Sequence, residues 1–177
     1  MIRSAAWPLL LSACGFVEEV SRTDFQIPEL RFYVDEGTIL VREPGPLDQT
    51  VDLETHDALY GASRLTDVRI EDLQVAVYAN ALGVGIEQLR FIAAPVSLES
   101  AAVFATVEDI GADEPDWPEV EANEQGEAHL VEFISNVRDE FLVQASITFD
   151  IPPEDSLESA GVLDLRLRIG VSASTSQ

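Results

Sequence analysis

The residues best suited to chemistry in this sequence are carboxylates gathered in one acidic stretch, DIGADEPD. It carries Asp109, Asp113, Glu114 and Asp116. Ca²⁺ takes about six to eight oxygen ligands from carboxylates, carbonyls and water. The stretch is therefore a candidate calcium site, although its spacing matches no EF-hand. A solvated acidic loop accounts for the same residues, so calcium is only a possible cofactor, and we expect no other.

The two histidines offer less chemistry. His56 stands near Glu54, Asp57 and Tyr60, a set that could hold a metal or act as a base, but a solvent-exposed histidine at a strand end fits equally well. Structural zinc sites need several Cys or His ligands at close spacing, and the sequence has one Cys and two His. It also contains no nucleophile elbow, phosphate-binding loop, dinucleotide glycine pattern or H-E-x-x-H motif. We therefore expect no enzyme, with a carboxylate-based hydrolase as an alternative because paired carboxylates can hydrolyse glycosides.

Trp117 is the most informative residue of the acidic segment 109–127. It lies between two prolines in the run PDWPE. Such a tryptophan packs across the end of a domain, or it stacks on a sugar ring or a partner surface. Because loops on a rigid frame commonly carry recognition, this segment is the candidate recognition loop.

The only cysteine of the chain follows a short apolar stretch. Arg3 precedes the apolar residues 4–11, and the tetrapeptide Leu-Ser-Ala-Cys ends at Cys14. A transmembrane helix needs about 20 apolar residues, so this stretch is too short to span a bilayer. A cysteine buried in a core is the plain alternative.

The tetrapeptide Leu11-Ser12-Ala13-Cys14 resembles the lipobox of bacterial lipoproteins. The resemblance implies that the Cys14 thiol is diacylated, that the chain is cut before it, and that the new amino terminus is acylated. Acyl chains anchor a protein stably when two or more are present. Residues 1–13 would then be a signal peptide and 14–24 a tether, leaving 25–174 as a single domain. Gly15 in place of Asp implies the outer membrane.

Composition restricts the partners that the chain can bind. The sequence has 33 acidic and 10 basic residues, a net charge of −23, and no lysine. Such a surface repels nucleic-acid phosphates and anionic lipid, so we expect no nucleic-acid partner. The 46% hydrophobic content excludes a disordered chain.

Alternation of apolar and polar residues predicts strands along most of the chain. The clearest case runs from Leu163 to Val171, with leucine, isoleucine and valine at odd positions and charges between them. In the run LTDVRIEDLQVAVYA the apolar parity changes, which predicts a β-bulge at Glu71-Asp72. Helical spacing in the run HLVEFISNVRDEF predicts one short helix near 129–138.

These patterns together predict an all-β fold, an Ig-like antiparallel β-sandwich of seven to nine strands with one short helix; a barrel is the alternative. The expected function is a lipid-anchored periplasmic or outer-membrane module for binding, adhesion or structure. Its partners would be the membrane, through the lipid, and an envelope protein or a glycan. A calcium-dependent adhesion or carbohydrate-binding domain is a further alternative.

Overall fold

A computed structural model describes residues 20–97, 100–112 and 117–176 of the protein. Most of the described residues lie in β-strands. In chain order, the elements are β1 (Val20–Val34), β2 (Ile39–Val41), β3 (Leu47–Val51), the 3-10 helix η1 (Asp57–Leu59), β4 (Leu65–Asn80), β5 (Ile86–Pro95), β6 (Ala102–Ile110), β7 (Glu121–Ala122), α1 (Glu124–Ser135), β8 (Phe141–Phe149), β9 (Ser156–Glu158) and β10 (Leu163–Ser176).

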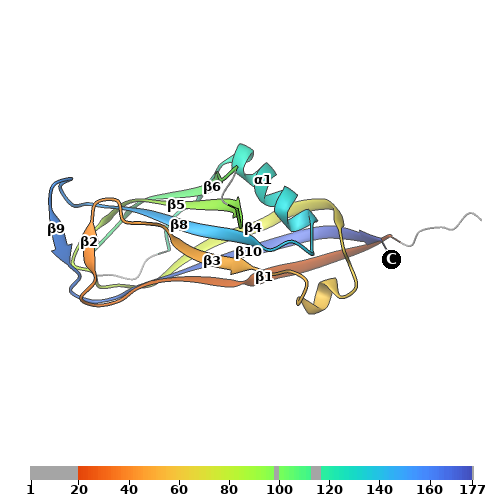
Figure 1. Cartoon of the computed structure of the whole chain (residues 1–177), viewed down its shortest axis with the longest axis horizontal. Coiled ribbons are helices and arrows are strands. Elements are labelled where there is room, and N and C mark those ends of the chain that lie inside the picture. Colours follow the sequence, from red (N-terminus) through yellow and green to blue (C-terminus); the bar gives the residue numbers. More distant parts are fainter. Residues whose placement is uncertain (1–19, 98–99, 113–116, 177) are drawn as a thin grey trace, which may run out of the picture.

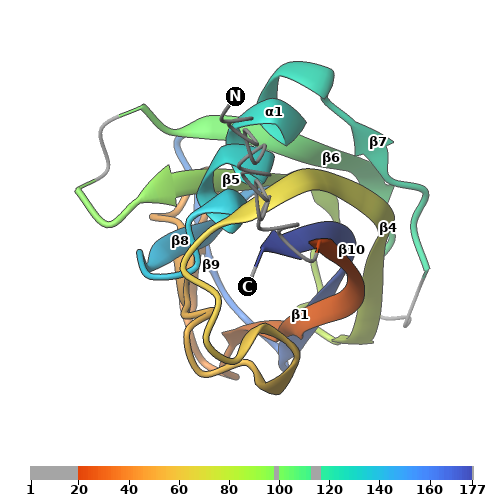
Figure 2. The same ribbon diagram turned by 90° about the vertical axis from the view of Figure 1, so that its right-hand side faces the viewer.

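The strands form two large antiparallel sheets and one small one. The first sheet has the order β1-β10-β4, the second β3-β8-β5-β6-β7, and β2 pairs with β9 alone. The two large sheets lie face to face along the long axis of the molecule (Figures 1 and 2). The predicted all-β sandwich with one short helix is therefore confirmed.

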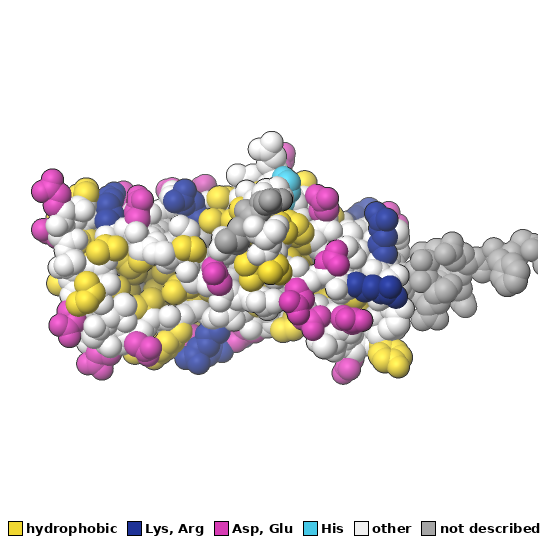
Figure 3. Space-filling view, viewed as in Figure 1, with side chains coloured by type: hydrophobic (Ala, Val, Ile, Leu, Met, Phe, Trp, Pro, Cys, Tyr) yellow, Lys and Arg dark blue, Asp and Glu magenta, His cyan; other side chains and the backbone are white. Residues whose placement is uncertain are grey.

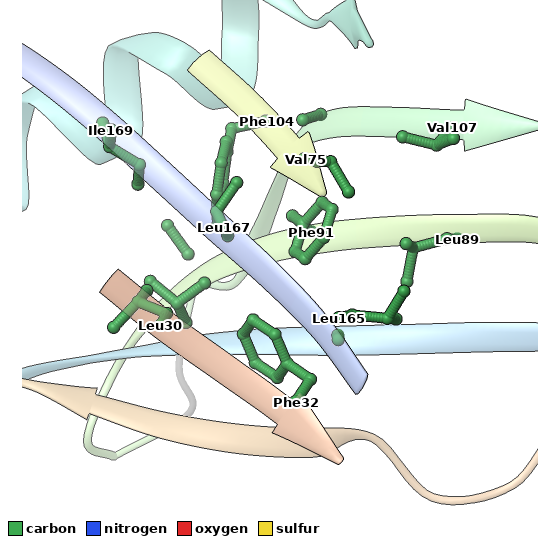
Figure 4. Close-up of a cluster of buried hydrophobic side chains, with 14 of the residues drawn as sticks. Leu30, Phe32, Val75, Leu89, Phe91, Phe104, Val107, Leu165, Leu167 and Ile169 are labelled. Carbon is green, nitrogen blue, oxygen red and sulfur yellow. The ribbon is translucent and has the colours of Figure 1, made fainter. Parts of the chain in front are cut away.

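The core lies between the two large sheets. On β10, Leu163, Leu165 and Leu167 are fully buried, as the alternation predicts. Phe32 lies beside Leu165 in the first sheet, and its ring meets that of Phe91 in the second sheet with the centroids 5.6 Å apart, which joins β1 to β5 across the sandwich. Figure 4 shows Phe32, Phe91 and Leu165 close together between the strands. Burial of such side chains contributes roughly 1.5–3 kcal/mol each, so this interface stabilises the packing of the two sheets.

Strand β4 contains the predicted bulge. Gly170 pairs with Asp72 and Val171 pairs with Ile70, so Glu71 is the extra residue. The two strands approach closely beside the bulge, since a Cβ added at Gly170 would lie only 3.1 Å from the Cβ of Asp72. The bulge returns the apolar positions of β4 to the core side after the change of parity.

The helix begins and ends earlier than the predicted 129–138. Asn123 caps α1, because its side chain accepts hydrogen bonds from the backbone N–H groups of Gln125 (3.1 Å) and Gly126 (3.2 Å). The first turn is polar and shows no apolar spacing, so the pattern becomes visible only at Leu130. The helix packs against β6, β4 and β5 and closes that side of the sandwich.

Two further expectations differ from the structure. The described residues form ten strands where seven to nine were expected. The extra ones arise because β2, β7 and β9 have only two or three residues and are too short to show alternation. Residues 20–24, expected in the tether, belong to β1 and pair with residues 172–176 of β10. Residues 21–24 are all polar and show no alternation with apolar residues, so the sequence does not predict this part of the strand. Backbone pairing with β10 holds it in the sheet.

We predict that Gly126→Ala destabilises the protein by about 2–3 kcal/mol through overpacking. An added Cβ would lie 1.7 Å from the carbonyl oxygen of Val103, so α1 must move away from β6. Urea unfolding measures the change. Gly45→Ala is the control, because its Cβ would meet nothing within 4 Å; equal midpoints for the two variants would contradict the close contact between α1 and β6.

Candidate functional site

The outer face of the β1-β10-β4 sheet carries an arginine network. Arg31 of β1 and Arg166 of β10 are direct cross-strand neighbours, an arrangement that like charges make unfavourable. Asp164 relieves the repulsion: its carboxylate accepts hydrogen bonds from Arg31 Nε (2.9 Å) and Nη2 (2.8 Å) and from Arg166 Nε (3.1 Å). The residue is only 8% exposed.

A second carboxylate extends the arginine network along the sheet. Glu29 accepts from Arg166 Nη1 (2.5 Å) and from Arg168 Nε (2.6 Å). The guanidinium carbon of Arg166 lies 4.5 Å from the ring centroid of Tyr78, and Arg168 Nη2 donates to the hydroxyl of Tyr78 (3.2 Å). Cation–π contact adds to the ion pairs, so charged side chains of β1 and β10 and the Tyr78 ring of β4 are joined on this face.

The electrostatics of the arginine network favour the ionised form of both of its carboxylates. Burial disfavours the ionised carboxylate of Asp164, but hydrogen bonds from Arg31 and Arg166 outweigh it, and the pKa of Asp164 lies below its ordinary value. Hydrogen bonds from Arg166 and then Arg168 lower the pKa of Glu29. Because both carboxylates are occupied by arginines, this face is suited to holding strands together rather than to proton transfer.

We predict that Asp164→Asn destabilises the protein by about 2 kcal/mol, because Arg31 and Arg166 lose their shared charged acceptor. Thermal and urea unfolding measure the effect. Glu132→Gln, at an exposed position of α1 with no ion pair among the described residues, is the matched control and should change stability by less than about 0.5 kcal/mol.

Asp164→Asn should also change how the stability of the protein depends on pH. The folded pKa values of Asp164 and Glu29 are lowered, so their contribution is fully present above the unfolded values of roughly 4. This stabilising contribution of the two carboxylates is lost as the pH falls below their unfolded pKa values toward their lower folded pKa values. Wild type should therefore lose stability from about pH 4.5 downward, and Asp164→Asn should lose less; parallel curves for both proteins would refute the assignment.

His56 has a structural role. Its Nδ1 accepts the backbone N–H of Ala58 (3.3 Å) and caps η1, and its Nε2 lies 3.0 Å from the carbonyl oxygen of Gln26. Because Nδ1 accepts, Nε2 carries the proton and donates it to that carbonyl. The ring also lies 5.4 Å from the ring of Phe25. Both nitrogens are occupied, and the side chain ties η1 to β1.

We expect His56→Ala to cost about 1 kcal/mol of stability, the usual value of a lost helix cap, and to loosen residues 57–59. Hydrogen exchange of the Ala58 amide reports the local change. His129→Ala replaces the other histidine, which lies within α1 and caps nothing, and serves as the control. An Ala58 amide that exchanges at the same rate in both variants would rule out the capping role.

The proposed calcium ligands fall largely outside the described residues. Asp113, Glu114 and Asp116 lie there, while Asp109 is the last residue but one of β6, with an exposed side chain and a φ of 56°. In the part of the chain that the structure describes, no group of three or more His, Cys, Asp or Glu side chains could hold a metal. The calcium site stays a prediction.

Two other predicted sites also stay predictions. Cys14 lies outside the described residues. Trp117 is 64% exposed, more than expected of a side chain packed across the end of the sandwich. Its place in the recognition loop is untested.

The β2–β9 end of the molecule carries three exposed aliphatic side chains, which we call the distal patch: Ile39, Val41 and Leu157. They are 60%, 41% and 43% exposed, whereas Leu40 between the first two is 2% exposed. Leu157 pairs with the buried Leu40 in the ladder, so Leu157 lies on the other face of the β2–β9 ribbon from Ile39 and Val41. The sequence alone does not reveal this patch, because the run ILV has the composition of an ordinary buried strand.

Carboxylates lie within β9 and on either side of β2 and β9 along the chain. All of them are exposed, and none forms an ion pair with another described residue: Glu36, Glu43, Glu154, Asp155 and Glu158. The nearest arginine in sequence, Arg42, pairs with Glu87. Figure 3 shows hydrophobic atoms near this end with acidic side chains along its rim.

The distal patch lies at the opposite end of the described structure from Val20 and Ser176. The first pair of the β1–β10 ladder joins Val20 to Ser176, and Figure 1 shows β2 and β9 at the other end of the long axis. No helix within residues 20–97, 100–112 and 117–176 is long and apolar enough to cross a membrane.

Comparison with known proteins gives no family for this chain. No protein-family model matches it. No curated protein matches it either. A solved chain described as Desmodium yellow mottle tymovirus aligns over 100% of this chain and 92% of its own length, with 11% identity and a TM-score of 0.31. A similarity that low carries no argument about fold or function.

Proposed function

We propose that this protein is a lipid-anchored module of the bacterial cell envelope that binds a partner through the distal patch and catalyses no reaction. The observation that carries the proposal is the position of that patch at the end of the sandwich farthest from Val20. An anchor at Cys14 would precede Val20 by only a few residues, so the domain would stand on its terminal end.

The dimensions favour presentation of the distal patch to a partner. β10 has 14 residues, and a strand rises roughly 3.3 Å per residue, so the sheet is about 45 Å long. With the lipid at one end, the patch would stand about that far from the bilayer surface. The exposed aliphatic side chains on both faces of the β2–β9 ribbon offer apolar surface that a partner can bury, and the distal patch is therefore the surface where we expect an envelope protein to bind.

The hydrogen bonds of the arginine network and of His56 support a binding function better than a catalytic one. The carboxylates of the arginine network accept from arginines, and both nitrogens of His56 are hydrogen bonded. Partner binding needs only a rigid frame and an exposed surface, and a sandwich with one continuous core provides both.

Replacement of the cysteine tests the anchor. We expect mass spectrometry of the native product to find residues 1–13 removed and acyl chains on Cys14. Cys14→Ser should stay uncut and lack the acyl chains, because it has no thiol to modify. Fractionation of cells into inner membrane, outer membrane and periplasm measures where each form resides.

Ser12→Thr is the control, since it keeps the thiol and a small side chain before the cut. It should fractionate with the outer membrane like wild type. A native product with an intact start and an unmodified sulfur would refute the anchored function.

A further inference from the structure

We propose that the distal patch binds an extended protein segment in which aliphatic and basic side chains alternate, and that this segment adds as a strand to the free edge of β9. The inference rests on the proposed function and names the partner class for the same surface. Three features of the β2–β9 end carry it: the backbone edge, the aliphatic side chains and the surrounding charge.

The backbone edge comes from the register of the ladder. Ser159 N donates to Thr38 O (2.9 Å) just before Ile39 pairs with Glu158. Hydrogen-bonded and non-bonded pairs alternate along an antiparallel ladder, so Leu157 bonds toward β2, while Ser156 and Glu158 direct their N–H and C=O groups away from it. β9 pairs with no other strand among the described residues, and Figure 1 shows it outside β2.

All three residues of β9 are exposed, so a strand can reach this edge. Strand addition is an established mode of peptide binding, in which backbone hydrogen bonds give affinity and alternate side chains give specificity. The edge is short, so side chains must supply much of the selectivity.

The side-chain pattern of the partner follows from the faces of β9. A residue of the added strand opposite Leu157 meets an aliphatic side chain that is 43% exposed. Its two neighbours point to the other face, where Glu158 and Ser156 lie beside Ile39 and Val41. Lysine or arginine suits those positions, because its charge meets Glu158 while its methylene groups cover Ile39 and Val41.

The surrounding charge selects a basic segment over other occupants. Five exposed carboxylates border the distal patch, and the whole chain has a net charge of −23. A second copy of the chain, or an anionic lipid surface, would bring like charge to like charge. A basic segment instead gains a favourable long-range attraction that screening by salt weakens.

The probe is a short fluorescent peptide of alternating lysine and valine, titrated against the full chain in non-ionic detergent, with anisotropy as the signal. We expect Leu157→Ser to weaken binding about tenfold and Glu158→Gln about threefold. An analogue N-methylated on the residues that face β9 should also bind about tenfold more weakly, because it loses backbone donors and keeps every charge.

Two control variants separate the distal patch from the acidic surface in general. Tyr60→Ser removes another exposed hydrophobic side chain, one that is 91% exposed in the η1 segment. Glu132→Gln removes one exposed charge from α1. Both should bind the peptide within about twofold of wild type.

Equal weakening by Glu132→Gln and Glu158→Gln, or unchanged affinity for Leu157→Ser, would mean that the peptide binds the acidic surface without using β9, which overturns the proposal. Absence of any binding overturns it as well. Neither result touches the anchor: Cys14 can be acylated, and the protein can reside in the outer membrane, with a partner of different chemistry.

Discussion

The structure depends on the central position of β10 in its sheet. Its odd-numbered side chains, from Leu163 to Ile169, fill the space against the second sheet, and its even-numbered ones supply Asp164, Arg166 and Arg168 to the outer face. Because side chains alternate along a strand, one register sets both the apolar core and the arginine network. A slip of one residue would bury the charges and expose the leucines, so the two faces together hold β1 and β4 in place.

The periodic part of this arrangement follows from the sequence. Alternation identifies β10, and the parity change in β4 identifies the bulge at Glu71. The contacts of Asp164 cannot be found in this way, because Arg31 is 133 positions away and only strand pairing brings the two together. The start of α1 is set by Asn123, a local cap with no periodic signal. The β2–β9 ribbon is too short for any period, which is why the distal patch emerges only from the structure.

The ion pairs of the arginines are distributed unevenly over the surface. Arg31, Arg166 and Arg168 are committed to two carboxylates on one face, while the carboxylates around the distal patch have no arginine among the described residues. The paired carboxylates bridge β1 and β10 in the half of the long sheet that is nearer to β2 and β9. Under the proposed function, the carboxylates around the distal patch would be the ones for which a partner supplies cations.

The β1–β10 ladder determines how the domain bears mechanical load. The paired residues run from Val20, opposite Ser176, to Val34, opposite Leu163, so β1 enters at the terminal end and leaves at the distal end. Under the proposed function, tension between a lipid at Cys14 and a partner at the β2–β9 end would act parallel to these strands. The ladder would then be loaded in shear, and extraction of β1 would require most of its backbone hydrogen bonds to break together. The direction of β1 and β10 is therefore the one that best resists extension along the long axis.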